Sequence, residues 1–164
     1  MPGTTGSPPG TTGSPSLPAY VVDASVIVKW LLPEPGSRQA DKLRGLAADG
    51  DCRLVAPDLW RVEVAHALWK QTRRAGPFGR GIGAEEVAAA LAQAARLPLD
   101  CVSAETLLPA ALEAALEAAI TLYDALYAAL AMQLQAPLVT ADWRLRDRLR
   151  ARWPEFGVVV LSEL

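Results

Sequence analysis

Histidine and cysteine, the residues that build zinc sites and disulfide frameworks, are scarce in this sequence. The 164 residues include one histidine and two cysteines, and Cys52 and Cys101 lie far apart with no Cys-x-x-Cys pair. A zinc site needs several such ligands at short spacings, and a disulfide framework needs several paired cysteines. Both are therefore excluded, and we expect two ordinary buried thiols in a reducing compartment.

A strong charge excess and a long hydrophobic run are also missing. The formal net charge is −2, which excludes a histone-like basic nucleic-acid binder but leaves room for a local basic patch or a metal site. Beyond the uncharged residues 1–22, which begin with the low-complexity segment, the longest stretch without a charged residue is 125–141; it contains Gln133, Gln135 and Pro137 and is too short to span a bilayer. Since the N-terminus lacks a signal-peptide pattern, we expect a cytoplasmic protein with no membrane partner.

What is present divides into a low-complexity start and a longer apolar remainder. The first sixteen residues are only Met, Pro, Gly, Thr and Ser, and the segment 2–8 is repeated as 9–15. Such residues cannot bury enough apolar surface to offset the entropy of ordering the backbone. We therefore expect residues 1–18 to form a disordered, dispensable tail. Apolar residues make up 51% of the chain, enough for one core over residues 19–164.

Short apolar runs alternate with helical segments along residues 19–164. The pattern predicts strands over 19–23, 53–56, 99–102, 138–140 and 158–161. It predicts helices over 25–32, 37–48, 58–74, 84–95, 104–118, 122–134 and 143–152. Uninterrupted apolar strands separated by helices are typical of a parallel sheet covered on both faces. The predicted fold class is therefore α/β, a three-layer α/β/α sandwich with a central parallel sheet.

Two carboxylates directly follow predicted strands. Asp23 ends the first strand, and Asp142 follows the strand at 138–140. Ligands of parallel sheets bind beyond the carboxyl ends of the strands, so both acids are candidate site residues. Each could instead simply cap the helix that follows it, because Asp is a preferred N-cap residue.

Two further carboxylates lie in predicted helices. Asp124 is the only charged residue between positions 118 and 141, and an isolated buried carboxylate is costly without a cation or donors. The alternative is a capping box with Thr121, and the two interpretations are compatible. Glu63 shares a polar stripe with Lys70 and the single histidine, His66, and this stripe could also be only a solvated helix face.

A parallel sheet can gather these acids at one edge. Converging carboxylates repel one another unless a cation joins them, and oxygen ligands without Cys or His select Mg²⁺ or Mn²⁺. Such an ion supports phosphodiester hydrolysis. The glycine-rich segment 76–83 is a weak phosphate-loop candidate, since it follows no strand and lacks the Gly-Lys-Ser/Thr ending.

At these residues the sequence resembles the PIN-domain ribonucleases of the VapC toxin type. The first motif is Val-Val-Asp23-Ala-Ser25-Val-Ile-Val-Lys-Trp, and the second is Pro57-Asp-Leu-Trp-Arg-Val-Glu63-Val-Ala-His. The third is Leu122-Tyr-Asp124-Ala-Leu-Tyr-Ala-Ala-Leu-Ala, and the fourth is Leu138-Val-Thr140-Ala-Asp142. All four occur in family order, and the resemblance covers residues 19–164.

The resemblance implies a metal-dependent endoribonuclease, the toxin of a type II toxin–antitoxin pair. It places Asp23, Glu63, Asp124 and Asp142 on the family's catalytic, metal-binding acids, with Mg²⁺ or Mn²⁺ as cofactor. It also implies that Ser25 and Thr140 support the site by hydrogen bonding. The implied partners are an RNA substrate, a cognate antitoxin and a second copy in a homodimer. Many members carry another acid at the position of Arg144, so whether one or two metals bind is open.

One helix carries a possible RNA-binding face. Arg144, Arg148 and Arg152 recur at i,i+4 spacing, so they share a face that could contact RNA phosphates. The alternative is a solvated helix in a chain that has thirteen arginines and three lysines.

Two other functions compete with the nuclease. A non-catalytic PIN-like module that binds RNA or protein is disfavoured by the intact set of four acids. A phospho-acceptor signalling domain needs paired acids after the first strand and a lysine after the last, whereas the chain has Asp23-Ala24 and no lysine after Lys70. We rank the signalling domain last.

Overall fold

The computed structural model describes residues 17–73 and 81–163. Within these residues five strands form one sheet in the order β3-β2-β1-β4-β5, with every neighbouring pair parallel. The strands are β1 (Ala19–Val22), β2 (Arg53–Pro57), β3 (Leu99–Val102), β4 (Leu138–Thr140) and β5 (Val158–Val160). Residues 1–16 of the expected tail and residues 76–80 of the glycine-rich segment lie outside the described residues.

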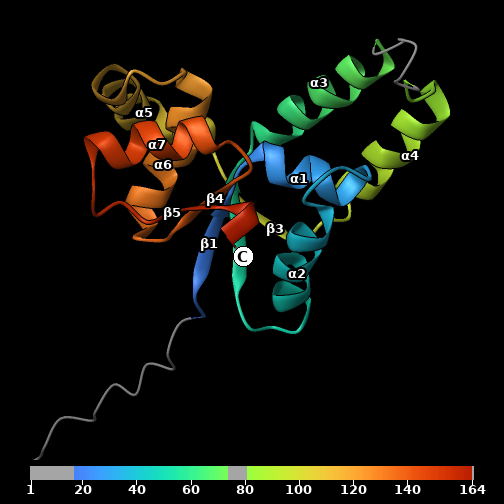
Figure 1. Cartoon of the computed structure of the whole chain (residues 1–164), viewed down its shortest axis with the longest axis horizontal. Coiled ribbons are helices and arrows are strands. Elements are labelled where there is room, and N and C mark those ends of the chain that lie inside the picture. The colour runs from blue at the N-terminus through green and yellow to red at the C-terminus, as the bar shows by residue number, and fades with distance from the viewer. Residues whose placement is uncertain (1–16, 74–80, 164) are drawn as a thin grey trace, which may run out of the picture.

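Helices cover both faces of this sheet. They are α1 (Ala24–Leu31), α2 (Ser37–Ala48), α3 (Trp60–Thr72), α4 (Ala84–Ala94), α5 (Ala104–Ala118), α6 (Leu122–Leu134) and α7 (Trp143–Arg152), followed by the short 3₁₀ turn η1 (Leu161–Glu163). Figure 1 shows α1 to α4 on one side of the sheet and α5 to α7 on the other. The predicted α/β class and three-layer sandwich are therefore confirmed.

The core lies between the sheet and these two helical layers. Val21 and Val22 of β1 are fully buried, as are Leu138 and Val139 of β4. The run 125–131 of α6 is also buried throughout, because this helix covers β1 and β2. Removing apolar surface from water stabilises the folded protein by about 25 cal/mol per Å². Such buried positions are therefore the main source of stability.

Helix α3 begins at Trp60, two residues later than its sequence predicts. Asp58 Oδ1 accepts a hydrogen bond from the backbone N of Ala104 at 2.9 Å, while the Asp58 N donates to the carbonyl of Val102 at 2.8 Å. Asp58 therefore caps α5, a helix far along the chain, rather than its own helix. Local spacing could not reveal a partner that only the sheet brings near.

The expectation of two buried thiols is half wrong. Cys52 is buried, but Cys101 is exposed. The reason is the strand order, since β3 lies at the edge of the sheet, where few neighbours cover its side chains. The Cys101 Sγ there accepts hydrogen bonds from the Trp60 Nε1 at 3.4 Å and from an Arg61 amino group at 3.3 Å.

Among the described residues, no single helix is long and apolar enough to cross a membrane. Helices α5 and α6 reach that length and composition only as a pair, and the chain bends by 112° between them.

Candidate active site

The sheet reverses its winding direction between β1 and β4. The chain leaves β1 toward β2 on one side and leaves β4 toward β5 on the other. Ligands of open parallel sheets bind at such a reversal, beyond the carboxyl ends of the strands. Asp23 directly follows β1, and Asp142 follows β4 by one intervening residue, so these acids flank the reversal from both sides.

Asp23 is buried and held by two hydroxyl groups. Its Oδ2 accepts hydrogen bonds from the Thr140 Oγ1 at 2.6 Å and the Ser25 Oγ at 2.7 Å. The same hydroxyls accept in turn from the loop after β4, Thr140 from the N of Asp142 at 3.0 Å and Ser25 from the N of Ala141 at 3.0 Å. Ser25 and Thr140 thus tie the end of β1 to the end of β4.

Glu63 receives its orientation from a tyrosine on the opposite helical layer. The Tyr127 hydroxyl of α6 donates to the Glu63 Oε2 at 2.5 Å, although Tyr127 itself is only 1% exposed. Sequence reasoning missed Tyr127. The signal was present, because a tyrosine inside a run of alanine and leucine needs a partner for its hydroxyl when it is buried.

Asp124 and Asp142 both stand at helix starts. The Thr121 Oγ1 donates to the Asp124 Oδ2 at 2.8 Å and accepts from the Asp124 N at 3.1 Å. The Asp142 Oδ1 accepts from the N of Arg144 at 2.8 Å and from the N of Leu145 at 3.4 Å. Both acids therefore have structural hydrogen bonds, and such capping leaves their second oxygen for other ligands.

Asp23, Glu63, Asp124 and Asp142, here called the acidic cluster, act on one another electrostatically. Burial raises the pKa of Asp23, against the lowering effect of its hydroxyl donors, and the charge of Asp142 adds to the rise. Burial also raises the pKa of Glu63 to about 7, with the charges of Asp23 and Asp124 adding to it. The pKa of Asp124 rises by burial and by the charges of Asp23 and Asp142. Burial, reinforced by neighbouring charges, therefore disfavours the ionised forms of Asp23, Glu63 and Asp124.

The donor set of the acidic cluster fits a hard divalent cation. Glu63, Asp124 and Asp142 each use one carboxylate oxygen in a hydrogen bond, and the other accepts none from the described residues. In the described ranges, however, no three Asp, Glu, His or Cys side chains are close enough to enclose an ion as they stand. An incomplete set of protein ligands is common for Mg²⁺, which is usually bound through one or two carboxylates, water and substrate phosphates.

The three arginines predicted to contact RNA and the single histidine lie in different parts of the structure. Arg152 pairs with Glu117, and Arg148 donates to the carbonyl of Ala119, so both contact the end of α5. Of the three arginines on this face, only Arg144 lies beside the acidic cluster, in a cleft with Asp142. The exposed His66 stacks on Trp69 with ring centroids 5.5 Å apart. RNA contact by Arg148 and Arg152 stays a prediction and would compete with these contacts.

The sequence and the fold both match known proteins. The family model described as the PIN domain matches residues 20–149, a range that contains the whole acidic cluster. The chain belongs to the PIN-domain family. The resemblance drawn from the four motifs is thereby confirmed at the level of this family of nucleases. No curated protein matches the sequence significantly.

Two solved structures share this PIN-domain fold. PAE2754 from Pyrobaculum aerophilum has 23% identity and a TM-score of 0.58, and the alignment covers 92% of this chain and 93% of that one. VapBC2 from Rickettsia felis, bound to a DNA fragment from its promoter, has 15% identity and a TM-score of 0.60, with coverage of 87% and 98%. At these identities the likeness is one of fold.

Glu63→Gln should stabilise the metal-free protein more at pH 8 than at pH 5. In the folded protein the pKa of Glu63 is raised from 4.5 to about 7. Below pH 4.5 this carboxyl is protonated in both the folded and the unfolded chain and does not destabilise folding. As the pH rises through about 7 it ionises in the folded protein as well, and that stability is lost. Melting temperatures of parent and variant in chelator, at both pH values, measure this difference. Glu113→Gln, an exposed position on α5, is the control, and an equal pH effect there would contradict the prediction.

Proposed function

We propose that the protein is a Mg²⁺- or Mn²⁺-dependent endoribonuclease that hydrolyses RNA phosphodiester bonds. The observation that carries the proposal is the acidic cluster in a PIN-domain protein. Asp23 and Asp142 flank the sheet reversal, and the charge of Asp23 acts on both Glu63 and Asp124. The raised pKa values of Asp23, Glu63 and Asp124 support the presence of a cation there, because a divalent ion would offset both the cost of burying these carboxylates and their mutual repulsion.

The four acids have distinct supporting contacts for this task. A divalent ion bound to them supplies Lewis-acid polarisation of the scissile phosphoryl group and lowers the pKa of an attacking water. Asp23 is the most rigidly held, because Ser25 and Thr140 fix one of its oxygens. The two hydroxyl donors are neutral, so they orient the carboxylate and leave its negative charge for the ion.

Incubation with structured RNAs in the presence and absence of Mg²⁺ or Mn²⁺ tests the proposal. Cleavage at defined internal sites, with ends that carry no 2′,3′-cyclic phosphate, is the expected result, because water and not the 2′-hydroxyl is the nucleophile. If the purified, folded protein binds these RNAs but leaves them intact with either ion, the non-catalytic binding module becomes the better explanation.

Tyr127→Phe is expected to lower RNA cleavage about 10-fold to 100-fold, the usual effect of removing a group that orients a metal ligand. The substitution keeps the buried ring but removes the 2.5 Å hydrogen bond to Glu63. Tyr123→Phe is the matched control, because Tyr123 lies on the same helix and is 58% exposed. Cleavage rates and Mn²⁺ affinities of both variants decide the point. Equal activity of Tyr127→Phe and the parent would show that Glu63 needs no such support.

We further propose the role of toxin in a toxin–antitoxin pair, with a cognate antitoxin and a homodimeric state. The VapBC2 structure, itself a complex, supports the antitoxin partner. Exposed leucines on α5 support a protein contact surface; they are Leu108, Leu112 and Leu116. A small open reading frame for a DNA-binding protein directly upstream would support the toxin role, and its absence would favour a housekeeping nuclease. Cytoplasmic localisation stays a prediction.

A further inference from the structure

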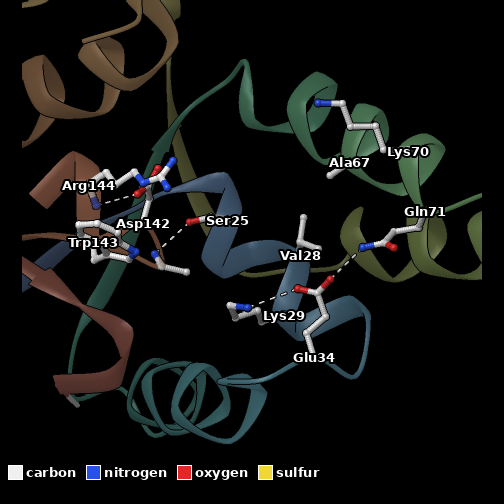
Figure 2. Close-up of a pocket in the computed structure, with 11 residues that line it drawn as sticks. Ser25, Val28, Lys29, Glu34, Ala67, Lys70, Gln71, Asp142, Trp143 and Arg144 are labelled. Atoms are coloured by element: carbon white, nitrogen blue, oxygen red, sulfur yellow. Dashed lines mark hydrogen bonds and ion pairs between the residues drawn. The ribbon is translucent and has the colours of Figure 1, made fainter. Parts of the chain in front are cut away.

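A cleft of about 790 Å³ opens beside the acidic cluster. Asp142 belongs to both, and Ser25, which donates a hydrogen bond to Asp23, also lines the cleft, so the cleft begins where the proposed chemistry takes place. From there it extends between α1 and α3 to Lys70 and Gln71. Figure 2 shows Trp143 and Arg144 at the Asp142 end of this cleft and Lys70 at the far end. Its volume lies within the range of about 300–1,000 Å³ that is typical of pockets for small organic ligands.

The Asp142 end of the cleft presents an aromatic ring to solvent. Trp143 is the first residue of α7 and is 56% exposed, although a large aromatic residue usually gains stability by burial. The Arg144 guanidinium lies 5.3 Å from the centroid of this ring. Apolar side chains of Val28, Ala67 and Ala141 line the cleft as well. A flat ring next to apolar groups is a suitable surface for a planar ligand.

The charges on the cleft walls favour an anion. Lys29 is paired with Glu34 at 3.3 Å, and Gln71 donates to the other Glu34 oxygen at 2.9 Å. The negative charge of Glu34 is therefore already compensated. Lys70 and Arg144, by contrast, form no salt bridge with any residue of the described ranges. Two cations that have no carboxylate partner among the described residues thus stand at opposite ends of the cleft, and Asp142 of the acidic cluster lies at the near end.

We propose that this cleft binds one unpaired nucleotide of the RNA strand, next to the phosphate that is cut. The base stacks on Trp143, while Arg144 and Lys70 contact the phosphates that flank it. The base must be unpaired, because a base in a duplex offers no free face to a side chain. This inference rests on the proposed ribonuclease function.

Binding of a labelled twelve-nucleotide single-stranded RNA of mixed sequence, measured in chelator, tests the stacking. Trp143→Ala should weaken binding about tenfold, as expected for the loss of one base–aromatic stack, and Trp143→Phe should retain most of it. The same RNA annealed to its complement should bind parent and Trp143→Ala equally. Intrinsic tryptophan fluorescence should fall when RNA binds the parent, and less so in Trp143→Ala. Melting temperatures confirm that the variants are folded.

Trp69→Ala is the matched control for the stacking. Trp69 is 53% exposed and has the Arg73 guanidinium 5.7 Å from its ring centroid, but it does not line the cleft. We expect its substitution to change single-strand binding less than twofold. The proposal is overturned if Trp143→Ala binds single-stranded RNA like the parent, if Trp69→Ala weakens it equally, or if duplex binding falls equally in Trp143→Ala.

The charged ends of the cleft have their own test. Lys70→Gln and Arg144→Gln should each reduce the slope of log K against log salt concentration by about 0.7, the value for one phosphate contact on a single strand. Lys42→Gln, an exposed lysine on α2 outside this cleft, should leave the slope unchanged. Unchanged slopes for both cleft variants would contradict phosphate contact. None of these binding measurements requires cleavage, so a parent protein that fails to cut RNA overturns the proposed function and not the nucleotide site.

Discussion

Asp124→Asn is expected to fold like the parent, to melt at the same or a higher temperature without metal, and to cut RNA far more slowly. The backbone hydrogen bond from residue 124 to the Thr121 Oγ1 does not involve the replaced oxygen, so the helix cap survives. The pKa of Asp124 is raised by burial and by the charges of Asp23 and Asp142. Removing this charge therefore relieves repulsion among the remaining acids.

The loss of cleavage in Asp124→Asn should be on the order of a thousandfold, because metal-ion stabilisation of the transition state is worth several kcal/mol. Mn²⁺ affinity, calorimetric melting and cleavage measured on one preparation separate the two roles. Asp58→Asn is the matched control, since Asp58 caps α5 by its hydrogen bond with Ala104 at 2.9 Å and lies outside the acidic cluster. If Asp124→Asn unfolds, or cuts at the parent rate, Asp124 is only a cap.

Removal of divalent metal is expected to abolish cleavage, and added Mg²⁺ or Mn²⁺ should restore it. Mn²⁺ binding should also stabilise the folded protein, since the ion neutralises carboxylates that burial and mutual repulsion destabilise. At a metal concentration of about 100 times Kd, the unfolding free energy should rise by about 2.7 kcal/mol. For a domain of this size that corresponds to roughly 5–10 °C in Tm.

The same metal titration on Asp124→Asn provides the control for specific binding. Its Tm should respond much less to Mn²⁺ than that of the parent, because one charged ligand is missing. Full cleavage in chelator would refute the metal-dependent mechanism while leaving the PIN-domain assignment intact. An equal rise in Tm for parent and variant would show that the ion binds elsewhere.

Most of the secondary structure follows from local patterns. The predicted strands 99–102 and 138–140 and the helices 104–118 and 122–134 have the observed bounds. Hydrophobic periodicity and capping residues act over a few positions, so a single segment contains the information. The start of α3 was missed because Asp58 pairs with Ala104, a residue that becomes its neighbour only when β2 and β3 align.

Local patterns likewise predict one part of the candidate site and miss another. The four acids and their hydroxyl neighbours could be singled out from strand ends, isolated charges and the four motifs. The contact between Tyr127 and Glu63 spans 64 positions of the chain, and no local pattern reports such a distance. The three arginines of α7 looked equivalent by spacing, yet Arg148 and Arg152 contact α5 whereas Arg144 faces the cleft.

The sequence by itself determined the alternation of strands and helices, the acids at the strand ends and the motifs of the PIN-domain family. These properties depend on residue type and short spacing. Only the tertiary structure decided which side chains meet: that Tyr127 orients Glu63, that burial and neighbouring acids raise the pKa values of Glu63 and Asp124, and that Trp143, Arg144 and Lys70 line one cleft. The physical reason is that these contacts join elements distant in the chain, and the order of strands in the sheet, rather than their order in the sequence, brings them together.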